Sequence, residues 1–393
     1  MIDLQRVRAE IPALENYTWF QNGGVSLTPA PVADEHARLM RELLTRGPMH
    51  IVYPDEEYAR RQQSMRRIAD FFDADADELA LMRGVSEAFQ TVLRGMTWQA
   101  GDEIMISEEE EAAVLLPALH LRDRHRVRVV KLPLTDDSER QLALFREAMT
   151  ERTKLVALSH VTTDRGFRLP VQAICEIARR QSISTFLDLA HSAGLFPLSL
   201  HALGCDYAGL LSYKWMYSPY AAGALYVRRE RIADLELTYA GGRAEKFLDF
   251  AEDRYKLHDT AERFQYGPWS WPLVHAWAFA CDYLSELGLD EIWNRTSRLT
   301  ARLKEGLKQI PEITLETPLD SGCSAALVAL SVDGWTGDEL AVTLRERWKM
   351  IVKPQPAHQN GLRISVTFFQ LEEEIDNLLE SLRTLIDERR KPT

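Results

Sequence analysis

The sequence predicts an α/β fold in which a mainly parallel sheet lies between helices, followed by a smaller α+β region. Short apolar runs typical of buried strands alternate with helical segments over much of the first 230 residues. The remaining part has four helical segments and only two apolar runs. With 393 residues, the chain can form a large core and a second, smaller domain.

Each element is expected from its own stretch of sequence. Helices are expected at residues 32–45, 54–72, 86–96 and 169–180, and strands at 79–83, 101–107, 154–161, 183–187, 207–211 and 223–227. In the C-terminal third, helices are expected at residues 273–287, 291–309, 336–349 and 372–388, with strands at 326–332 and 361–367. Residues 245–266 show no clear periodicity, so an irregular segment is expected there.

Composition excludes several classes of protein. The chain carries 47 Lys and Arg against 59 Asp and Glu, a net charge of −12, which argues against a nucleic-acid or anionic-membrane partner. The four cysteines show neither CxxC nor metal-like spacing, which fits a reducing compartment and gives no sign of a metal site. No run of 18 or more apolar residues and no signal core is present, so we expect a soluble, cytoplasmic protein.

Charged side chains follow two of the expected strands. Asp188 ends the strand at residues 183–187, and Lys214 comes shortly after the strand at residues 207–211. Taken singly, Asp188 could cap a helix and Lys214 could be a surface lysine. Because open α/β sheets place ligands beyond the carboxyl ends of their strands, the two side chains are candidates to meet at one rim. A lysine that forms a Schiff base and an aspartate that pairs with the pyridinium nitrogen are what pyridoxal 5'-phosphate (PLP) needs from a protein.

The longer pattern around these residues resembles the class V aminotransferase superfamily of fold-type I PLP enzymes. Lys214 follows Asp188 by 26 residues, as in that family. The matching positions are Asp188, Ala190, His191, Gly194, Leu203, Gly204, Asp206, Lys214, Gly223, Leu225, Tyr226 and Val227. The resemblance implies a seven-stranded, mainly parallel sheet and a homodimer with its active site at the interface. It also implies an N-terminal segment (residues 1–30) that lines the site, a large PLP-binding domain (31–265) and a small C-terminal domain (266–393).

The resemblance also implies the site residues. Lys214 would be the catalytic residue, and the cofactor would be held by Gly84, Val85, Ser86, Thr163, Asp188, His191, Ser212, Tyr213, Lys214 and Gly267. Ser86 is expected to open a helix after Gly84, and the free N–H groups of a helix start suit the cofactor phosphate. An amino-acid substrate would contact Asn22, Gly24 and Arg363, with the planar fork of Arg363 on its α-carboxylate. His160 is expected to be structural.

Three positions depart from the family pattern. Glu111 stands where relatives stack a flat side chain on the pyridine ring, which a carboxylate cannot do as an aromatic does. Either another residue covers that face, or Glu111 transfers protons, or the local alignment slips. Thr163 replaces an asparagine that holds the cofactor's phenolic oxygen. Pro268 replaces a threonine that reaches the partner subunit's phosphate, which would leave that contact to Gly267 or Ser270 or remove it.

The chemistry is left with alternatives. Similarity is greatest to the isopenicillin-N-epimerase-like branch, and β-elimination from a cysteine-derived amino acid, as in C–S lyases, is the first expectation. Epimerisation or transamination of an amino acid is the alternative, and a non-catalytic scaffold with this fold is the alternative of another class. Cysteine desulfurases need a mobile cysteine in the loop at residues 352–361, and this loop has none, although it carries His358.

Overall fold

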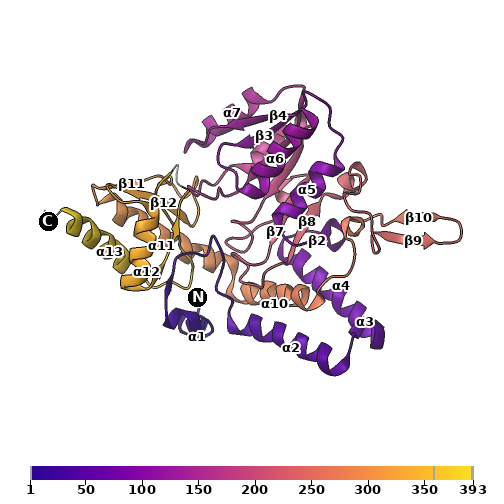
Figure 1. Ribbon diagram of the computed structural model, residues 1–393, viewed down its shortest axis with the longest axis horizontal. Coiled ribbons are helices and arrows are strands. Elements are labelled where there is room, and N and C mark those ends of the chain that lie inside the picture. The colour runs from indigo at the N-terminus through magenta and orange to yellow at the C-terminus, as the bar shows by residue number, and fades with distance from the viewer. Residues whose placement is uncertain (1, 357–358, 391–393) are drawn as a thin grey trace.

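A computed structural model describes residues 2–356 and 359–390 of the protein, and His358 lies outside this range. Its centre is a seven-stranded sheet with the order β2-β8-β7-β6-β5-β3-β4 (Figure 1). The strands are β2 (Leu79–Met82), β3 (Glu103–Ser107), β4 (Arg128–Leu132), β5 (Thr153–Ser159), β6 (Ser184–Asp188), β7 (Tyr207–Leu211) and β8 (Gly223–Val227). Strand β8 runs antiparallel to both its neighbours, and the other pairings are parallel. The predicted fold class is therefore confirmed.

In this sheet every strand except the edge strand β4, which is partly exposed, is buried on both faces. Along β5, Leu155 and Ala157 enter one hydrophobic cluster, while Val156 and Leu158 enter another. This alternation explains why the strands consist of nearly continuous apolar runs, as is usual for parallel strands covered by helices. The covering helices are α5 (Val85–Gly95), α6 (Ala112–His125), α7 (Ser138–Ala148), α8 (Val171–Arg180), α9 (Leu200–Leu203) and α10 (Trp271–Leu287). Helix α8 makes the predicted crossover between β5 and β6.

The predicted start of α5, at Ser86, is one residue too late. Gly84 is the N-cap, with φ 153°, and Ser86 is the second residue of the helix. A glycine is suited to this backbone conformation because residues with a Cβ seldom adopt it. The turn therefore begins closer to the end of β2 than a serine cap would place it.

The C-terminal region has its own four-stranded sheet, in the order β11-β12-β15-β14. These strands are β11 (Ile313–Leu315), β12 (Leu327–Val332), β14 (Lys353–Pro354) and β15 (Leu362–Ser365). They pack in one hydrophobic cluster with α11 (Leu289–Lys308), α12 (Gly337–Trp348) and α13 (Glu372–Arg390), close to the predicted ranges. The expected domain boundaries at residues 30 and 265 stay a prediction.

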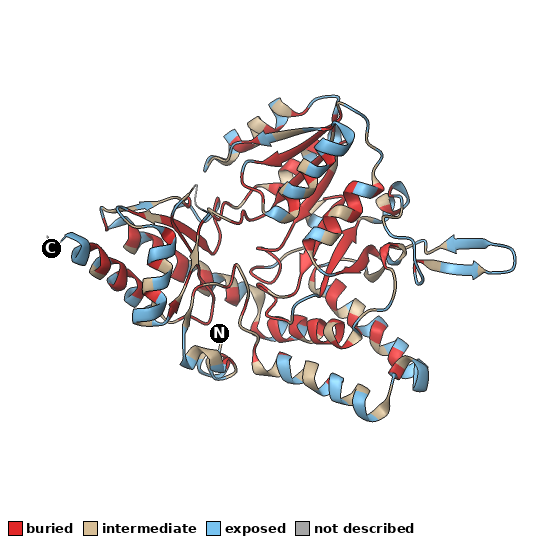
Figure 2. Cartoon of the chain, viewed as in Figure 1, coloured by how far each residue is buried: buried red, intermediate tan, exposed pale blue. Residues whose placement is uncertain are grey.

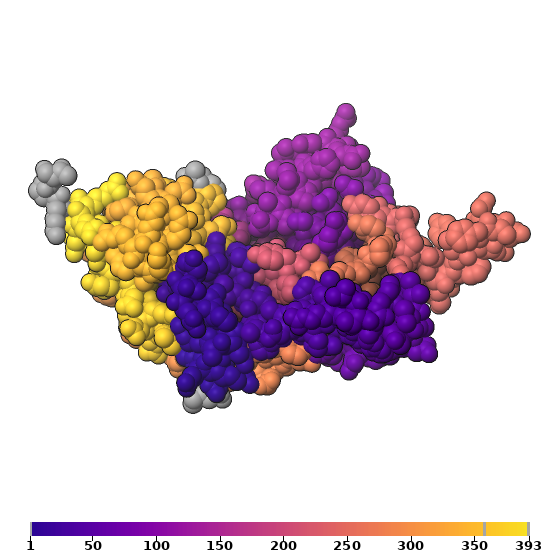
Figure 3. All heavy atoms as spheres, turned by 60° about the horizontal axis from the view of Figure 1, so that its bottom comes forward, coloured from indigo at the N-terminus to yellow at the C-terminus, as the bar shows by residue number. Residues whose placement is uncertain are grey.

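The N-terminal segment is tied to this C-terminal region. It contains α1 (Leu4–Ala9), a 3-10 turn (Pro12–Glu15) and the short strand β1 (Thr18–Trp19). Strand β1 pairs in parallel with β13 (Met350–Ile351), and the N–H of Gly23 donates to Oγ of Ser365 at 2.9 Å. In Figure 3 the indigo N-terminal residues lie against the yellow and orange C-terminal part.

Residues 245–266 are not irregular, and that prediction is wrong. They contain an antiparallel hairpin of β9 (Glu245–Asp249) and β10 (Arg254–Leu257), followed by a 3-10 turn (Ala261–Phe264). The hairpin projects from the body and is largely exposed (Figure 2). Phe250 at its tip is 86% exposed. Because the hairpin buries neither face within the chain, its sequence lacks the alternation of a half-buried strand.

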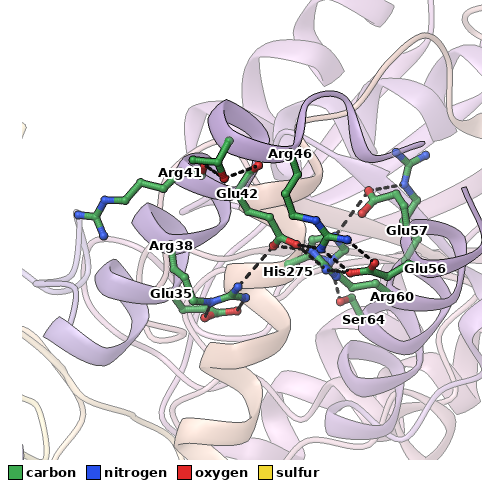
Figure 4. Close-up of polar contacts among 12 residues, drawn as sticks. Glu35, Arg38, Arg41, Glu42, Arg46, Glu56, Glu57, Arg60, Ser64 and His275 are labelled. Carbon is green, nitrogen blue, oxygen red and sulfur yellow. Dashed lines mark hydrogen bonds and ion pairs between the residues drawn. The ribbon is translucent and has the colours of Figure 1, made fainter. Parts of the chain in front are cut away.

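A charged network joins two N-terminal helices, α2 (Ala30–Arg46) and α4 (Pro54–Phe71), beside α10 and the short α3 (Met49–Val52). Glu42 lies at its centre and accepts hydrogen bonds from Arg46 at 2.8 Å and from Arg60 at 3.0 Å (Figure 4). These arginines lower the pKa of Glu42 to about 2, chiefly through the Arg60 hydrogen bond. Across to α10, Oγ of Ser64 lies 2.8 Å from Nδ1 of His275. No described helix combines the length and apolar character that a bilayer crossing requires.

Candidate active site

A cavity of about 560 Å³ opens at the carboxyl ends of β6 and β7. Asp188 is the last residue of β6, and Lys214 follows β7 by three residues. Ten of the predicted site residues line this one cavity: Gly24, Gly84, Val85, Ser86, Thr163, Asp188, His191, Tyr213, Lys214 and Arg363. Residues from both sheets and backbone from the N-terminal segment thus meet at the predicted rim.

Three predicted residues lie outside the cavity wall of this single chain. Asn22 is buried and donates through Nδ2 to the carbonyl of Lys214 at 3.2 Å. The hydroxyl of Ser212 donates to the carbonyl of Pro219 at 2.6 Å. The N–H of Gly267 donates to the carbonyl of Gly242 at 2.8 Å. These contacts depend on how loops fold, within one loop for Ser212 and between segments far apart in sequence for Asn22, and no local pattern in the sequence indicates them.

Asp188 and Lys214 influence each other without touching. Burial raises the pKa of Asp188 to about 6, although the nearby ammonium of Lys214 opposes the change. Burial likewise lowers the pKa of Lys214 to about 8, against the pull of Asp188. Within the described chain no ion pair joins them, although one oxygen of Asp188 accepts from the N–H of Ala190 at 2.8 Å. The two side chains therefore leave room for a group between them.

His191 lies beside Lys214. Its Nε2 is 3.2 Å from Nζ of Lys214 and 3.3 Å from Oγ1 of Thr163, and the indole N–H of Trp215 lies 3.4 Å from its Nδ1. Because an indole can only donate, Nδ1 accepts and the proton of a neutral imidazole sits on Nε2. Burial, followed by the Lys214 charge, holds the pKa of His191 well below its usual value, so the ring is neutral.

Arg363 extends this chain of hydrogen bonds to the C-terminal sheet. It is 1% exposed, and its Nη1 donates to the carbonyl of Thr163 at 2.7 Å and to Oγ1 of Thr163 at 3.1 Å. Its Nε and Nη2 are buried and have no partner among the described residues. An unpaired buried guanidinium is costly, so this geometry suits a bound carboxylate. Burial lowers the pKa of Arg363 to about 10, which still leaves it charged near neutral pH.

The start of α5 forms another wall. No side chain caps this helix, and a Cβ built on Gly84 would meet no atom within 4 Å. An uncapped helix start of this kind, with open space before it, provides N–H groups and a positive dipole end for an anion. An anion site, a lysine, a buried carboxylate and an unpaired guanidinium together fit a phosphorylated pyridine aldehyde and an amino acid.

Glu111 lies in the cavity wall at the N-cap of α6. Its Oε2 accepts from the N–H of Ala113 at 2.5 Å. Tyr213, also in the wall, stacks on Tyr220 with ring centroids 5.0 Å apart. The structure thus places the Glu111 carboxylate in the cavity wall, where it caps α6, and its correspondence to the flat ring of relatives stays a prediction.

Glu110 is another buried carboxyl group close to the site, and the sequence alone predicts no functional role for it. Its two oxygens accept from the hydroxyls of Ser107 and Ser159, both at 2.7 Å. Burial raises its pKa to about 7, and the nearby charge of Asp188 adds to the increase. The acidic run at residues 108–111 was its only signal. Glu110 thus joins the ends of β3 and β5 behind the site.

His160 and the cysteines lie elsewhere. His160 is buried and forms an edge contact with Phe196, and burial lowers its pKa to about 3, which agrees with a structural role. All four cysteines are described, buried and free, and none lines the cavity. Sγ of Cys323 donates to the carbonyl of Asp136 at 3.0 Å.

Comparison with known proteins shows the family to which the chain belongs. The sequence model of the aminotransferase class V family matches residues 18–378. The chain is 30% identical over 342 residues to isopenicillin N epimerase of Streptomyces clavuligerus, covering 83% of this chain and 84% of that protein. It is 26% identical over 396 residues to a probable cysteine desulfurase of Methanothermobacter thermautotrophicus, covering 96% and 97%.

Solved structures share the fold. Cysteine desulfurase from Thermococcus onnurineus, without its cofactor, matches with a TM-score of 0.88 at 24% identity, covering 99% of both chains. The cystine C–S lyase C-DES, in complex with cysteine persulfide, matches with a TM-score of 0.87 at 23% identity, covering 95% of this chain and 98% of that one.

Proposed function

The chain belongs to the aminotransferase class V family, whose members depend on PLP, and from this we propose that it is a lyase acting on a cysteine-derived amino acid. The reaction would be β-elimination, in which the amino acid and water yield a thiol, pyruvate and ammonia. The observation that carries the proposal is the single cavity shared by Asp188, Lys214, the start of α5 and Arg363.

Each wall of the cavity suits one part of the cofactor or substrate. The N–H groups at Val85 and Ser86 would hold the phosphate, and Lys214 would hold the aldehyde carbon. Asp188 would pair with the ring nitrogen, and the free Nε and Nη2 of Arg363 would bind the substrate's α-carboxylate. When bound, PLP supplies an electron sink for charge that develops at Cα.

Lys214 is the residue placed to take the Cα proton. With a pKa of about 8, a minor part of the Lys214 population is a neutral amine near neutral pH, and this part grows as pH rises, so Lys214 can act as a general base. The neutral ring of His191, 3.2 Å away, can orient that amine without adding a repelling charge. Loss of the Cα proton to Nζ would let the Cβ–S bond break, with the bonding electrons leaving on sulfur as a thiolate, which then takes up a proton to give the thiol.

A desulfurase reaction is a weaker candidate for this chain. In the family that reaction uses a cysteine thiol to accept sulfur from the substrate. All four cysteines here are buried and away from the cavity, and residues 352–361 contain none. Similarity to cysteine desulfurases therefore supports the fold and the cofactor more than sulfur transfer.

Epimerisation is the second candidate, and Glu111 favours it. Inverting Cα requires one group to remove a proton and another to return it on the opposite face. Glu111 stands in the same cavity as Lys214, and its charge raises the pKa of Lys214. The similarity to isopenicillin N epimerase points the same way. The remaining family reaction, transamination, has no comparable feature in its favour.

We also propose that the protein is a homodimer in the cytoplasm. The projecting hairpin carries exposed aromatic side chains at Phe247, Phe250 and Tyr255, which a single chain leaves in water. Gly267 lies outside this chain's own cavity, as expected if it serves the partner's site. Pro268 supplies neither a hydroxyl nor an N–H, so that contact would come from neighbouring residues.

The test is to incubate the purified, PLP-loaded protein with S-substituted L-cysteines and to measure pyruvate, ammonia and deuterium exchange at Cα. Pyruvate with ammonia supports the lyase, and exchange with inversion but no pyruvate supports the epimerase. If none of the amino acids yields products or changes the visible absorbance of the bound cofactor, both the lyase and the epimerase proposals are contradicted and a non-catalytic scaffold is favoured. Asp188→Asn should abolish turnover while the protein still folds, because the substitution keeps the size of the side chain but removes the charge that would pair with the ring nitrogen.

A further inference from the structure

Lys353 is a cavity residue to which the proposed chemistry gives no task. It lies in β14, where its Cα is the register partner of Arg363 in β15, and both side chains line the cavity. Antiparallel register partners project to the same side of a sheet. The cavity therefore has two neighbouring cations on its C-terminal wall.

Neither cation is neutralised by a bound carboxylate within the described chain. Lys353 makes no hydrogen bond or ion pair there, and Nε and Nη2 of Arg363 are buried without partners. The charged groups that face Lys353 are Arg363, Asp164 and Glu111. Burial, and then the charge of Arg363, lower the pKa of Lys353, as expected for a partly buried ammonium beside another cation.

One α-carboxylate can neutralise only one of the two cations on this wall. It carries a single negative charge, and the planar fork of Arg363 takes both of its oxygens in the favoured bidentate geometry. An ammonium on a flexible stem is suited to a second, separate anion. Asp164 and Glu111 influence Lys353, but neither comes within ion-pairing distance of it. The wall is thus built for a ligand with two negative groups.

We propose that Lys353 recognises a second anionic group, carried on the side chain of the amino-acid substrate. This rests on the proposed function, because it takes the α-carboxylate to be bound by Arg363. The substrate class is then an amino acid whose side chain ends in a carboxylate or a comparable acid. Lys353 sets specificity, and it takes no part in bond making or breaking.

The test compares ligands that differ in one charge and cannot be turned over. The PLP-loaded protein is titrated by calorimetry with 2-methyl-L-aspartate and 2-methyl-L-asparagine, and with the corresponding glutamate and glutamine pair; none has a Cα proton. In the native protein we expect the acid of at least one pair to bind about tenfold more tightly than its amide, as is typical of one partly buried charge pair. Lys353→Met should remove this preference and change the amide's affinity less than about twofold, and Lys353→Glu should reverse it.

The controls separate this inference from the function on which it rests. Lys308→Met, at an exposed position on α11, should leave both affinities unchanged. Equal affinity for acid and amide in the native protein overturns the role of Lys353 while PLP binding and amino-acid binding stand. Equal weakening of acid and amide in Lys353→Met also overturns it, because Lys353 would then serve the α-carboxylate or the cofactor. If PLP or every amino acid fails to bind, the proposed function falls, and this inference falls with it.

Discussion

Nζ of Lys214 lies 3.2 Å from Nε2 of His191, and His191 in turn lies 3.3 Å from the hydroxyl of Thr163, which accepts from Arg363. The residue proposed to move a proton is thereby connected to the residue proposed to bind a carboxylate. Each of these hydrogen-bonded residues comes from a different part of the polypeptide, so the two sheets must pack correctly against each other for the cavity to form. Because His191 is neutral, this series of hydrogen bonds orients the side chains and places no further charge beside Lys214.

The low pKa of Lys214 should appear in the pH dependence of PLP uptake by cofactor-free protein. Only the neutral amine attacks an aldehyde, so the uptake rate should rise with pH up to about 8 and level off above it. Stopped-flow absorbance measures this rate. A rate that rises steadily towards pH 10 would show that Lys214 has the pKa of an ordinary lysine and would contradict this prediction. Asp188→Asn should move the midpoint below the native value, because Asp188 raises the pKa of Lys214.

Replacing Arg363 with lysine should weaken amino-acid binding without disturbing the cofactor. Lysine keeps the charge but cannot form the two parallel hydrogen bonds, so we expect a loss of about 10- to 100-fold in affinity. The visible spectrum of bound PLP should stay unchanged. Arg302→Lys is the matched control, since Arg302 pairs with Asp376 on the surface at 2.7 Å. Unchanged affinity in Arg363→Lys would remove Arg363 from the carboxylate site.

Glu110 should make the stability of the cofactor-free protein fall as pH rises. Its pKa is raised from 4.5 to about 7 in the folded state, so folding favours the protonated form. The stabilisation is complete below pH 4.5 and is lost as pH approaches about 7, by up to about 3 kcal/mol. Glu110→Gln should unfold in urea with a flatter pH profile over that range. Glu139→Gln, at an exposed site, should retain the native profile.

Glu42 should stabilise the packing of α2 on α4. Glu42→Gln removes the charge that Arg46 and Arg60 share, and we expect a loss of about 1–2 kcal/mol in unfolding free energy at pH 7. Because the folded pKa of about 2 is below the usual 4.5, this contribution is present above pH 4.5. The difference from the native protein should therefore shrink as pH falls towards 2. Glu147→Gln is the control, since its contact with Arg140 is exposed and 3.7 Å long. A difference that does not depend on pH would contradict the charge argument.

Strands buried on both faces were the most predictable elements. Strands β7 and β8 occupy the predicted residues because continuous apolar runs there end at polar residues or glycine. The meeting of Asp188 and Lys214 at one rim was predictable for the same reason, since each lies at or just after the end of such a strand. The projecting hairpin was missed because its faces are exposed in this chain, so burial imposes no pattern on its residues.

Contacts between distant segments were out of reach of the sequence. The bond from Ser212 to Pro219 and that from Asn22 to the Lys214 carbonyl depend on how loops pack. Glu110 is one of four consecutive glutamates, and only the ends of β3 and β5 distinguish it from its neighbours. The positions of Asp188 and Lys214 in the sequence therefore predicted the kind of chemistry, whereas the contacts of individual side chains required the three-dimensional structure.

The central claim is that Lys214 holds PLP in the cavity that it shares with Asp188. The most direct test is to load the protein with PLP, reduce it with borohydride, digest it and locate the added phosphopyridoxyl mass by tandem mass spectrometry. We predict that the label is on Lys214 and is absent from Lys214→Ala treated in the same way. A label on another lysine with Lys214 unmodified, or no label in a protein that has folded, would contradict the account.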